Sequence, residues 1–270
     1  MILAPTLTLN TPARGYDADA TAFAAASGAT DVAALSAFVK GVKELGLWNS
    51  MVCWPLRSSQ NYGSGTTAFS LGGLGTYNGT LTNGPSWGAD GVTFDGTDDF
   101  IITPLEANDH PSGISELVVF NAPADTGSFS MFFGDEGSGL GEHATLIRRN
   151  AGDNSVNLAT DFTVSRANAI QAITFGQWNS VHARIVAPSN FISVNAASEA
   201  SNTASGTFAP SSPTADRIGF GARDKFYGGT YFAKMTAAFG AFWSSGTSSA
   251  QMQAVKTLYK STLGTGLSLP

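Results

Sequence analysis

Residues 90–101 read Asp-Gly-Val-Thr-Phe-Asp-Gly-Thr-Asp-Asp-Phe-Ile, and this stretch decides the fold class. It places a short strand between two Asp-Gly turns and begins a second strand directly afterwards. From Leu47 onward turn residues stay dense, and we expect further turns at Asn78-Gly79 and Asn83-Gly84. Further strands are expected at residues 100–102, 115–120, 128–133, 145–149, 156–159, 180–186, 191–194, 217–220 and 237–243. Many short strands separated by turns predict an all-β sandwich or barrel.

Helical patterns lie on both sides of the strands. Residues 1–15 read as an extended arm, and the Ala-rich residues 17–26 predict a helix that ends at Gly28. A second helix is expected after Thr30, which we assign as its N-cap. Its apolar positions recur at steps of three and four residues: Val32, Leu35, Phe38, Val39, Val42 and Leu45. A third helix is expected over residues 251–262, capped by Ser248 or Ser249.

The composition narrows the function classes. The 270 residues carry 14 Lys and Arg against 20 Asp and Glu, a net charge of −6, and the basic residues are scattered, which argues against nucleic acid. No stretch approaches the ~20 apolar residues of a membrane helix. The single cysteine, Cys53, excludes an intrachain disulfide framework, and the first residues do not read as a signal peptide, so we expect synthesis in a cytoplasm. Charged residues make up 13%, about half of the ~25% of typical domains, and such a neutral surface suits packing against other proteins.

A family resemblance begins with Trp54-Pro55-Leu56, residues 78–85, Trp87 and residues 94–101. Residues 175–181 and 191–195 follow in the same order, although Ala196 stands where a glycine usually follows. Together these segments resemble a laminin-G-like domain of the concanavalin A-like lectin/glucanase superfamily. The resemblance implies an antiparallel jelly-roll β-sandwich, here with an N-terminal arm, a helical extension and a C-terminal helix.

A second resemblance involves the N-terminal helices. Residues 16–50 are similar to a segment common in phage-encoded structural proteins, where it often precedes an all-β module. We therefore expect residues 1–47 to form an arm and two-helix anchoring segment, and residues 48–270 to form the laminin-G-like domain.

The catalytic signature of the superfamily is missing. Its glucanases carry carboxylates that alternate along one strand as Glu-x-Asp-x-Glu, so that they share one face. Asp98-Asp99 and Asp135-Glu136 are adjacent and would point to opposite faces of a strand. The histidines show no metal-site spacing, and we expect His182 to be structural. From these observations we expect no enzymatic activity.

Two kinds of binding site stay open. The resemblance implies that calcium could lie at the sheet rim, and Asp95, Asp98 and Asp99 are its expected ligands; turn formation by the same residues is the alternative. Apart from calcium, we expect no cofactor. Sugar binding in this fold uses exposed aromatic residues, and the candidates in glycine-rich contexts are Tyr77, Trp87, Tyr227 and Tyr231. The alternative for these is packing at the sandwich ends or between subunits.

The leading sequence hypothesis is a structural protein of a virus particle, either a capsid decoration, a head fibre or a tail-associated component. Its partners would be other virion proteins of the capsid or tail lattice and copies of itself, with host surface glycans as a further partner, and its location would be the virion. The alternative is a carbohydrate-binding module that acts in adhesion to host glycans.

Overall fold

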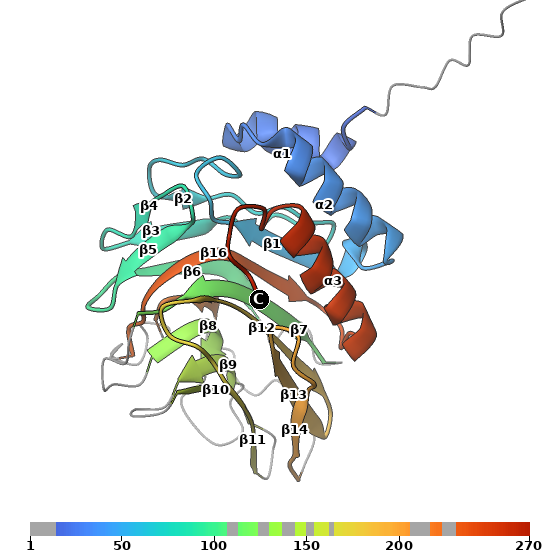
Figure 1. Ribbon diagram of the computed structural model, residues 1–270, viewed down its shortest axis with the longest axis vertical. Coiled ribbons are helices and arrows are strands. Elements are labelled where there is room, and N and C mark those ends of the chain that lie inside the picture. Colours follow the sequence, from blue (N-terminus) through green and yellow to red (C-terminus); the bar gives the residue numbers. More distant parts are fainter. Residues whose placement is uncertain are drawn as a thin grey trace, which may run out of the picture.

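The computed structural model describes residues 15–106, 113–123, 130–136, 144–149, 154–161, 165–205, 217–222 and 231–270. Within these residues the strands pair antiparallel in two sheets (Figure 1). The first sheet runs in the order β14 (Ala200–Thr203), β13 (Ser189–Val194), β12 (Trp178–Val186), β7 (Ser115–Asn121), β16 (Lys234–Trp243), β5 (Val92–Asp95) and β4 (Ser86–Trp87), and β1 (Met51–Pro55) also pairs with β16. The second runs in the order β11 (Arg166–Ala172), β10 (Ser155–Asp161), β9 (Ala144–Arg149), β8 (Ser130–Glu136), β15 (Arg217–Phe220), β6 (Phe100–Glu106), β3 (Gly79–Thr82) and β2 (Thr67–Ala68). This confirms the predicted all-β antiparallel sandwich.

The main core lies between the two sheets. Trp54 of β1 meets Phe133 and Phe220 of the second sheet edge-on, with ring centroids 6.2 and 5.9 Å apart. Gly240 of β16 lies against the same rings, and a Cβ atom there would come within 2.3 Å of Phe220. The absence of a side chain at Gly240 therefore lets large aromatic rings fill the interior.

A second core covers the other face of the first sheet. Two helices, α1 (Ala18–Ser27) and α2 (Val32–Glu44), lie over this face together with α3 (Ser249–Ser261) (Figure 1). Phe239 of β16 contacts Phe38 of α2 and Tyr259 of α3, with ring centroids 5.4 and 4.7 Å apart. Because both faces of the first sheet are buried at its central strand β7, residues 117–120 of this strand are all apolar and do not alternate with polar residues.

The helix ends largely follow the sequence predictions. Gly28 ends α1 with φ at 74°, and Ser248 caps α3 with a complete capping box. The assignment of Thr30 as the N-cap of α2 is wrong, because the side chain of Asp31 accepts the hydrogen bond from the Ala34 N–H.

The prediction of a turn at Asn78-Gly79 is also wrong. Gly79 begins β3 instead, and a Cβ atom there would lie 2.7 Å from Ile101, so the glycine serves close strand packing. The turn at Asn83-Gly84 is confirmed by φ values of 68° and 114°.

Some predictions lie outside the described residues, namely most of the N-terminal arm and Tyr227. The division at residues 47 and 48 stays a prediction, although α1 and α2 share the second core with the sheet.

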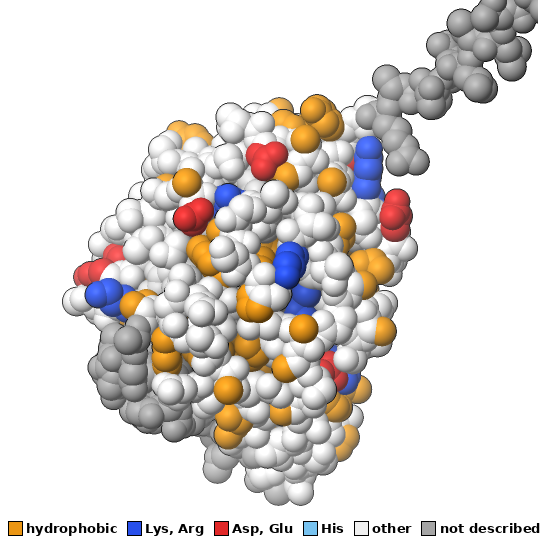
Figure 2. Space-filling model, in the orientation of Figure 1, with side chains coloured by type: hydrophobic (Ala, Val, Ile, Leu, Met, Phe, Trp, Pro, Cys, Tyr) orange, Lys and Arg blue, Asp and Glu red, His pale blue; other side chains and the backbone are white. Residues whose placement is uncertain are grey.

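Figure 2 shows few and scattered charged side chains on the face in view. Among the described residues no helix is both long enough and apolar enough to cross a membrane.

Candidate functional site

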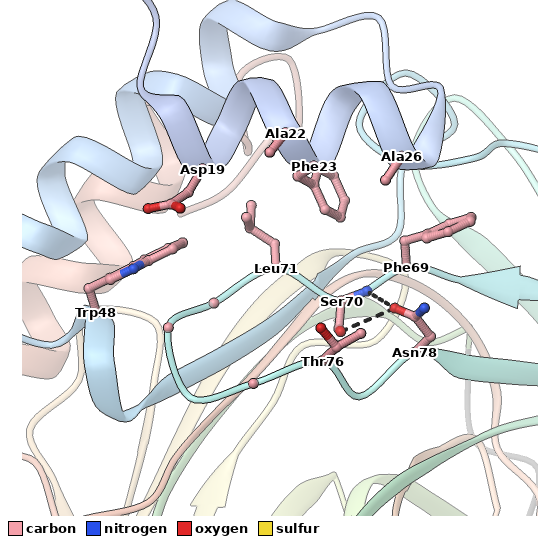
Figure 3. Close-up of a pocket in the computed structure, with 13 residues that line it drawn as sticks. Asp19, Ala22, Phe23, Ala26, Trp48, Phe69, Ser70, Leu71, Thr76 and Asn78 are labelled. Atoms are coloured by element: carbon pink, nitrogen blue, oxygen red, sulfur yellow. Dashed lines mark hydrogen bonds between the residues drawn. The ribbon is translucent and has the colours of Figure 1, made fainter.

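Two adjoining hollows open beside Trp48. The first, of about 370 Å³, lies between α1 and the glycine-rich residues 69–78 (Figure 3). The second, of about 380 Å³, is lined by Lys43, Gly46 and Asn49. Because Asp19 and Trp48 line both hollows, we treat them as one site, the Trp48 groove.

The local sequence explains why an indole lies here. After α2 ends, Gly46 turns the chain with φ at 71°, and Trp48 begins the short 3-10 helix η1 (Trp48–Ser50). Gly73 of the opposite loop donates its N–H to the Trp48 carbonyl at 3.2 Å. A Cβ atom at Gly73 would lie 2.8 Å from Cδ1 of the indole, so only glycine lets the loop approach this closely.

Charged groups flank one side of the ring. Lys43 Nζ lies 5.1 Å from the ring centroid of Trp48 and forms ion pairs with Asp17 at 2.8 Å and Asp19 at 2.6 Å. Burial lowers the pKa of Lys43, but hydrogen bonds and charge from the two aspartates outweigh this effect, and the pKa lies above its usual value. Asp19 is half exposed, so its carboxylate can accept a ligand hydrogen bond while it stays paired.

Polar groups form the opposite wall. Asn78 Oδ1 accepts hydrogen bonds from the Ser70 N–H at 2.9 Å and from Ser70 Oγ at 3.2 Å, as the dashed lines show (Figure 3). Asn78 Nδ2 makes no hydrogen bond with any described residue, and its two N–H groups remain for a ligand. In Figure 3, Phe23 and Ala26 of α1 point toward this loop, where Phe69 and Leu71 add apolar surface. The groove thus joins apolar faces to a few polar groups, the combination that small-molecule sites share.

The three predicted calcium ligands come together. Asp95, Asp98 and Asp99 each offer a carboxylate oxygen, and these atoms lie within 4.8 Å of one another. Asp95 Oδ1 accepts the Thr97 N–H at 2.7 Å, and Asp99 Oδ2 accepts the Asp95 N–H at 2.9 Å. The loop therefore closes on its own hydrogen bonds, while further carboxylate oxygens remain for a hard cation. Calcium stays a prediction.

Hydrogen bonding and burial shift the pKa values of Asp95 and Asp99 in opposite directions. Backbone hydrogen bonds, above all from Thr97, lower the pKa of Asp95. Burial raises the pKa of Asp99; the hydrogen bond from Asp95 opposes this, and the negative charges of Asp95 and Asp98 raise it further. The loop concentrates negative charge without a described cationic partner in ion-pair contact.

The predicted aromatic residues do not share this groove. Tyr77 and Trp87 are partly buried against the main core, and Trp87 Nε1 donates to the Gly65 carbonyl at 3.1 Å. The Tyr231 carbonyl accepts the Met131 N–H at 3.2 Å, beside the second sheet. None of the three lines the Trp48 groove.

The sequence predictions missed Asp19, Lys43 and Trp48 as site residues. Asp19 lies on α1, Lys43 on α2 and Trp48 on η1, and the packing of α1 against α2 lets Lys43 contact both Asp19 and the Trp48 ring. One usable signal was present: a tryptophan two residues after a helix-ending glycine, where a large ring is held at a surface junction.

The fold resembles those of several solved structures. Trypanosoma rangeli sialidase in complex with 2,3-difluorosialic acid matches with a TM-score of 0.57 at 11% identity, over 87% of this chain and 40% of that chain. A mutant of the same sialidase that displays trans-sialidase activity matches with 0.53 at 10%, over the same shares. The binding domain of botulinum neurotoxin serotype D matches with 0.54 at 8%, over 78% of this chain and 52% of that chain.

These comparisons show the fold. The chain spans about 40% of the length of the sialidases it matches. The sequence matches no protein-family model and no curated protein. The comparisons support the general part of the predicted family resemblance, a β-sandwich of a kind found in carbohydrate-active proteins. Nothing in the comparisons indicates a phage origin.

One sequence expectation needs correction. We expected no enzymatic activity because the alternating carboxylates of the glucanases are missing. The matched structures include sialidases, which are glycoside hydrolases, and this chain covers about 40% of their length, so this fold occurs as part of enzymes. The missing motif therefore does not exclude activity, and the expectation is withdrawn.

Proposed function

We propose that the chain is a carbohydrate-binding unit and that the Trp48 groove holds the glycan. The observation that carries this proposal is that Trp48 and Asp19 line both adjoining hollows. An indole offers a broad apolar face to the C–H groups of a sugar ring. Asp19 would accept hydrogen bonds from sugar hydroxyls, and Asn78 would donate them.

The size of the groove supports an oligosaccharide. Each hollow is near the lower end of the ~300–1,000 Å³ range of ligand pockets. Their volumes of about 370 and 380 Å³ suit one sugar ring each, and Trp48 lines both hollows. The matched folds support this coarsely, since one solved structure of similar fold holds a sialic acid derivative.

A glycan array followed by calorimetry tests the proposal. We expect micromolar binding of at least one oligosaccharide and a loss of tenfold or more in Trp48→Ala. Asp19→Asn should also weaken glycan binding, and it leaves the core intact because Asp19 is half exposed. Sialylated glycans belong on the array, and release of free sugar measured in parallel shows whether binding leads to cleavage.

Trp87→Ala is the matched control, because it removes an indole outside the groove. Binding that persists in Trp48→Ala and Asp19→Asn but is lost in Trp87→Ala or Tyr77→Ala would move the site to the aromatic residues predicted from sequence. Absence of binding to every glycan would contradict the proposal. Melting curves of each variant separate lost binding from lost folding.

The virion interpretation stays a prediction. Incorporation into a capsid or tail, self-association and a location on the particle have no support in the comparisons. The neutral surface that suggested them is equally suited to a glycan ligand, whose recognition needs few charges.

A further inference from the structure

A second pocket lies where α3 meets the first sheet, away from the Trp48 groove. Lys256 of α3 is only 7% exposed. Its Nζ donates to Ser193 Oγ at 3.0 Å and to the Asn195 carbonyl. An ammonium group has three N–H donors, so one remains for another acceptor.

A hollow of about 350 Å³ opens beside this lysine, and we call it the Lys256 pocket. Lys260 adds a second positive charge, while Asn195 and Gln253 add amide groups. Leu269 and the methylene groups of the lysines give it apolar walls. Figure 2 shows a group of blue side chains beside α3 with no red side chain next to it on this face.

The charge of Lys256 is poorly compensated. No side-chain carboxylate of the described residues forms an ion pair with Lys256 or Lys260. Glu199 attracts Lys256 from a distance, but Arg184 already holds its carboxylate through bonds of 2.9 and 2.7 Å. Burial lowers the pKa of Lys256 to about 8 despite that attraction.

We propose that the Lys256 pocket binds the carboxylate of a small organic acid, with Lys256 and Lys260 holding the carboxylate and Leu269 covering the apolar body. An anion supplies the acceptor that the third Lys256 N–H lacks and the ion-pair contact that no described carboxylate makes with Lys256. A pocket of about 350 Å³ suits a ligand no larger than a monosaccharide acid. The proposal is independent of glycan binding in the Trp48 groove.

Binding should depend on pH in a defined way. Lys256 must be protonated to hold the anion, so affinity should fall as the pH rises through about 8. At pH 9, about one lysine in ten is protonated, and the affinity should be about tenfold weaker than at pH 7. The other charged groups near Lys256 are Lys260, Arg184 and Glu199; His182 is neutral here, since burial lowers its pKa well below 6.5.

Calorimetry with butyrate, benzoate and glucuronate, each against its neutral amide, tests this proposal on the full chain. We expect at least one acid to bind with a millimolar Kd or tighter, its amide not to bind, and binding to weaken about tenfold between pH 7 and 9. Lys256→Met should abolish binding, and Lys260→Met should weaken it several-fold. Preference for glucuronate identifies an acidic sugar as the ligand type, and preference for butyrate or benzoate a free organic acid.

Lys234→Met is the control, because it removes an exposed lysine outside the pocket. Lys256→Met is expected to fold, since a buried charge can be replaced by an apolar residue of similar volume. The proposal fails if every acid binds no better than its amide, or if Lys256→Met binds as well as Lys234→Met. Either result leaves binding at the Trp48 groove unaffected.

Discussion

Asp17 caps α1 and binds α2 with the same carboxylate. Its Oδ1 accepts the Asp19 N–H at 2.9 Å, and its Oδ2 lies 2.8 Å from Lys43 Nζ. The Asp17 N–H also donates to Ser36 Oγ of α2 at 2.8 Å. One residue therefore fixes the start of α1 against α2, and α1 forms a wall of the Trp48 groove.

Asp17→Ala should destabilise the protein by about 2 kcal/mol, because it removes an N-cap and leaves Lys43 with fewer partners. Urea unfolding measures this loss. Asp19→Ala is the control: it removes only a half-exposed ion pair, which is expected to contribute less than about 1 kcal/mol. Equal losses in the two variants would show that the cap has no special role.

The sequence predicted the elements well where the pattern is local. The apolar stripe of α2 predicted a buried face, and Phe38 of that stripe is fully buried. It could not predict the partner surface, which includes Phe239 of the same chain, and the anchoring role that we assigned to this helix stays a prediction. Strand β11 was missed because its sequence, RANAIQA, has few strand-forming residues; pairing with β10 holds it in place.

The same distinction explains the candidate sites. Asp95, Asp98 and Asp99 lie within five residues of one another, so a single loop brings them together, and the sequence predicted the cluster. The Trp48 groove joins residues 19, 43–49 and 69–78. Since only tertiary packing brings these segments together, no local pattern could predict the groove as a whole; the local sequence offers only the tryptophan that follows the helix-ending Gly46.

Gly240→Ala should destabilise the main core. A Cβ atom at this position would lie 2.3 Å from Phe220 Cζ and 3.1 Å from Phe133 Cε2. Neither ring has room to move, because both contact Trp54, and overpacking of this kind costs about 1–3 kcal/mol. Gly15→Ala is the control, because no atom lies within 4 Å of the new methyl group. Its midpoint of urea unfolding should equal that of the wild type. A Gly240→Ala midpoint equal to that of Gly15→Ala would refute this packing argument.

His182 should make stability fall at mildly acidic pH. Burial, together with the positive charges of Lys256 and Arg184, lowers the pKa of His182 well below 6.5. Below pH 6.5 the unfolded chain therefore binds a proton that the folded chain does not, and the free energy of unfolding should fall by up to about 1.4 kcal/mol per pH unit. Urea unfolding between pH 7 and 5 should show this slope in the wild type and a shallower one in His182→Gln. Parallel curves would mean that His182 is not the group responsible.

Asp99→Asn separates turn formation from calcium binding. The pKa of Asp99 is higher in the folded chain than in the unfolded chain, so the free energy of unfolding falls as the pH rises from the unfolded to the folded value. At neutral pH this loss of stability is complete. Asparagine keeps an oxygen for the Asp95 N–H but not the charge, and in calcium-free buffer at pH 7 the variant should melt slightly above the wild type. If the triad holds calcium, added calcium should raise the wild-type melting temperature, a chelator should reverse the rise, and Asp99→Asn should respond less. Asp90→Asn, outside the triad, should respond as the wild type does. If calcium leaves the wild-type melting temperature unchanged, the three aspartates serve only to form the turn and bind no calcium.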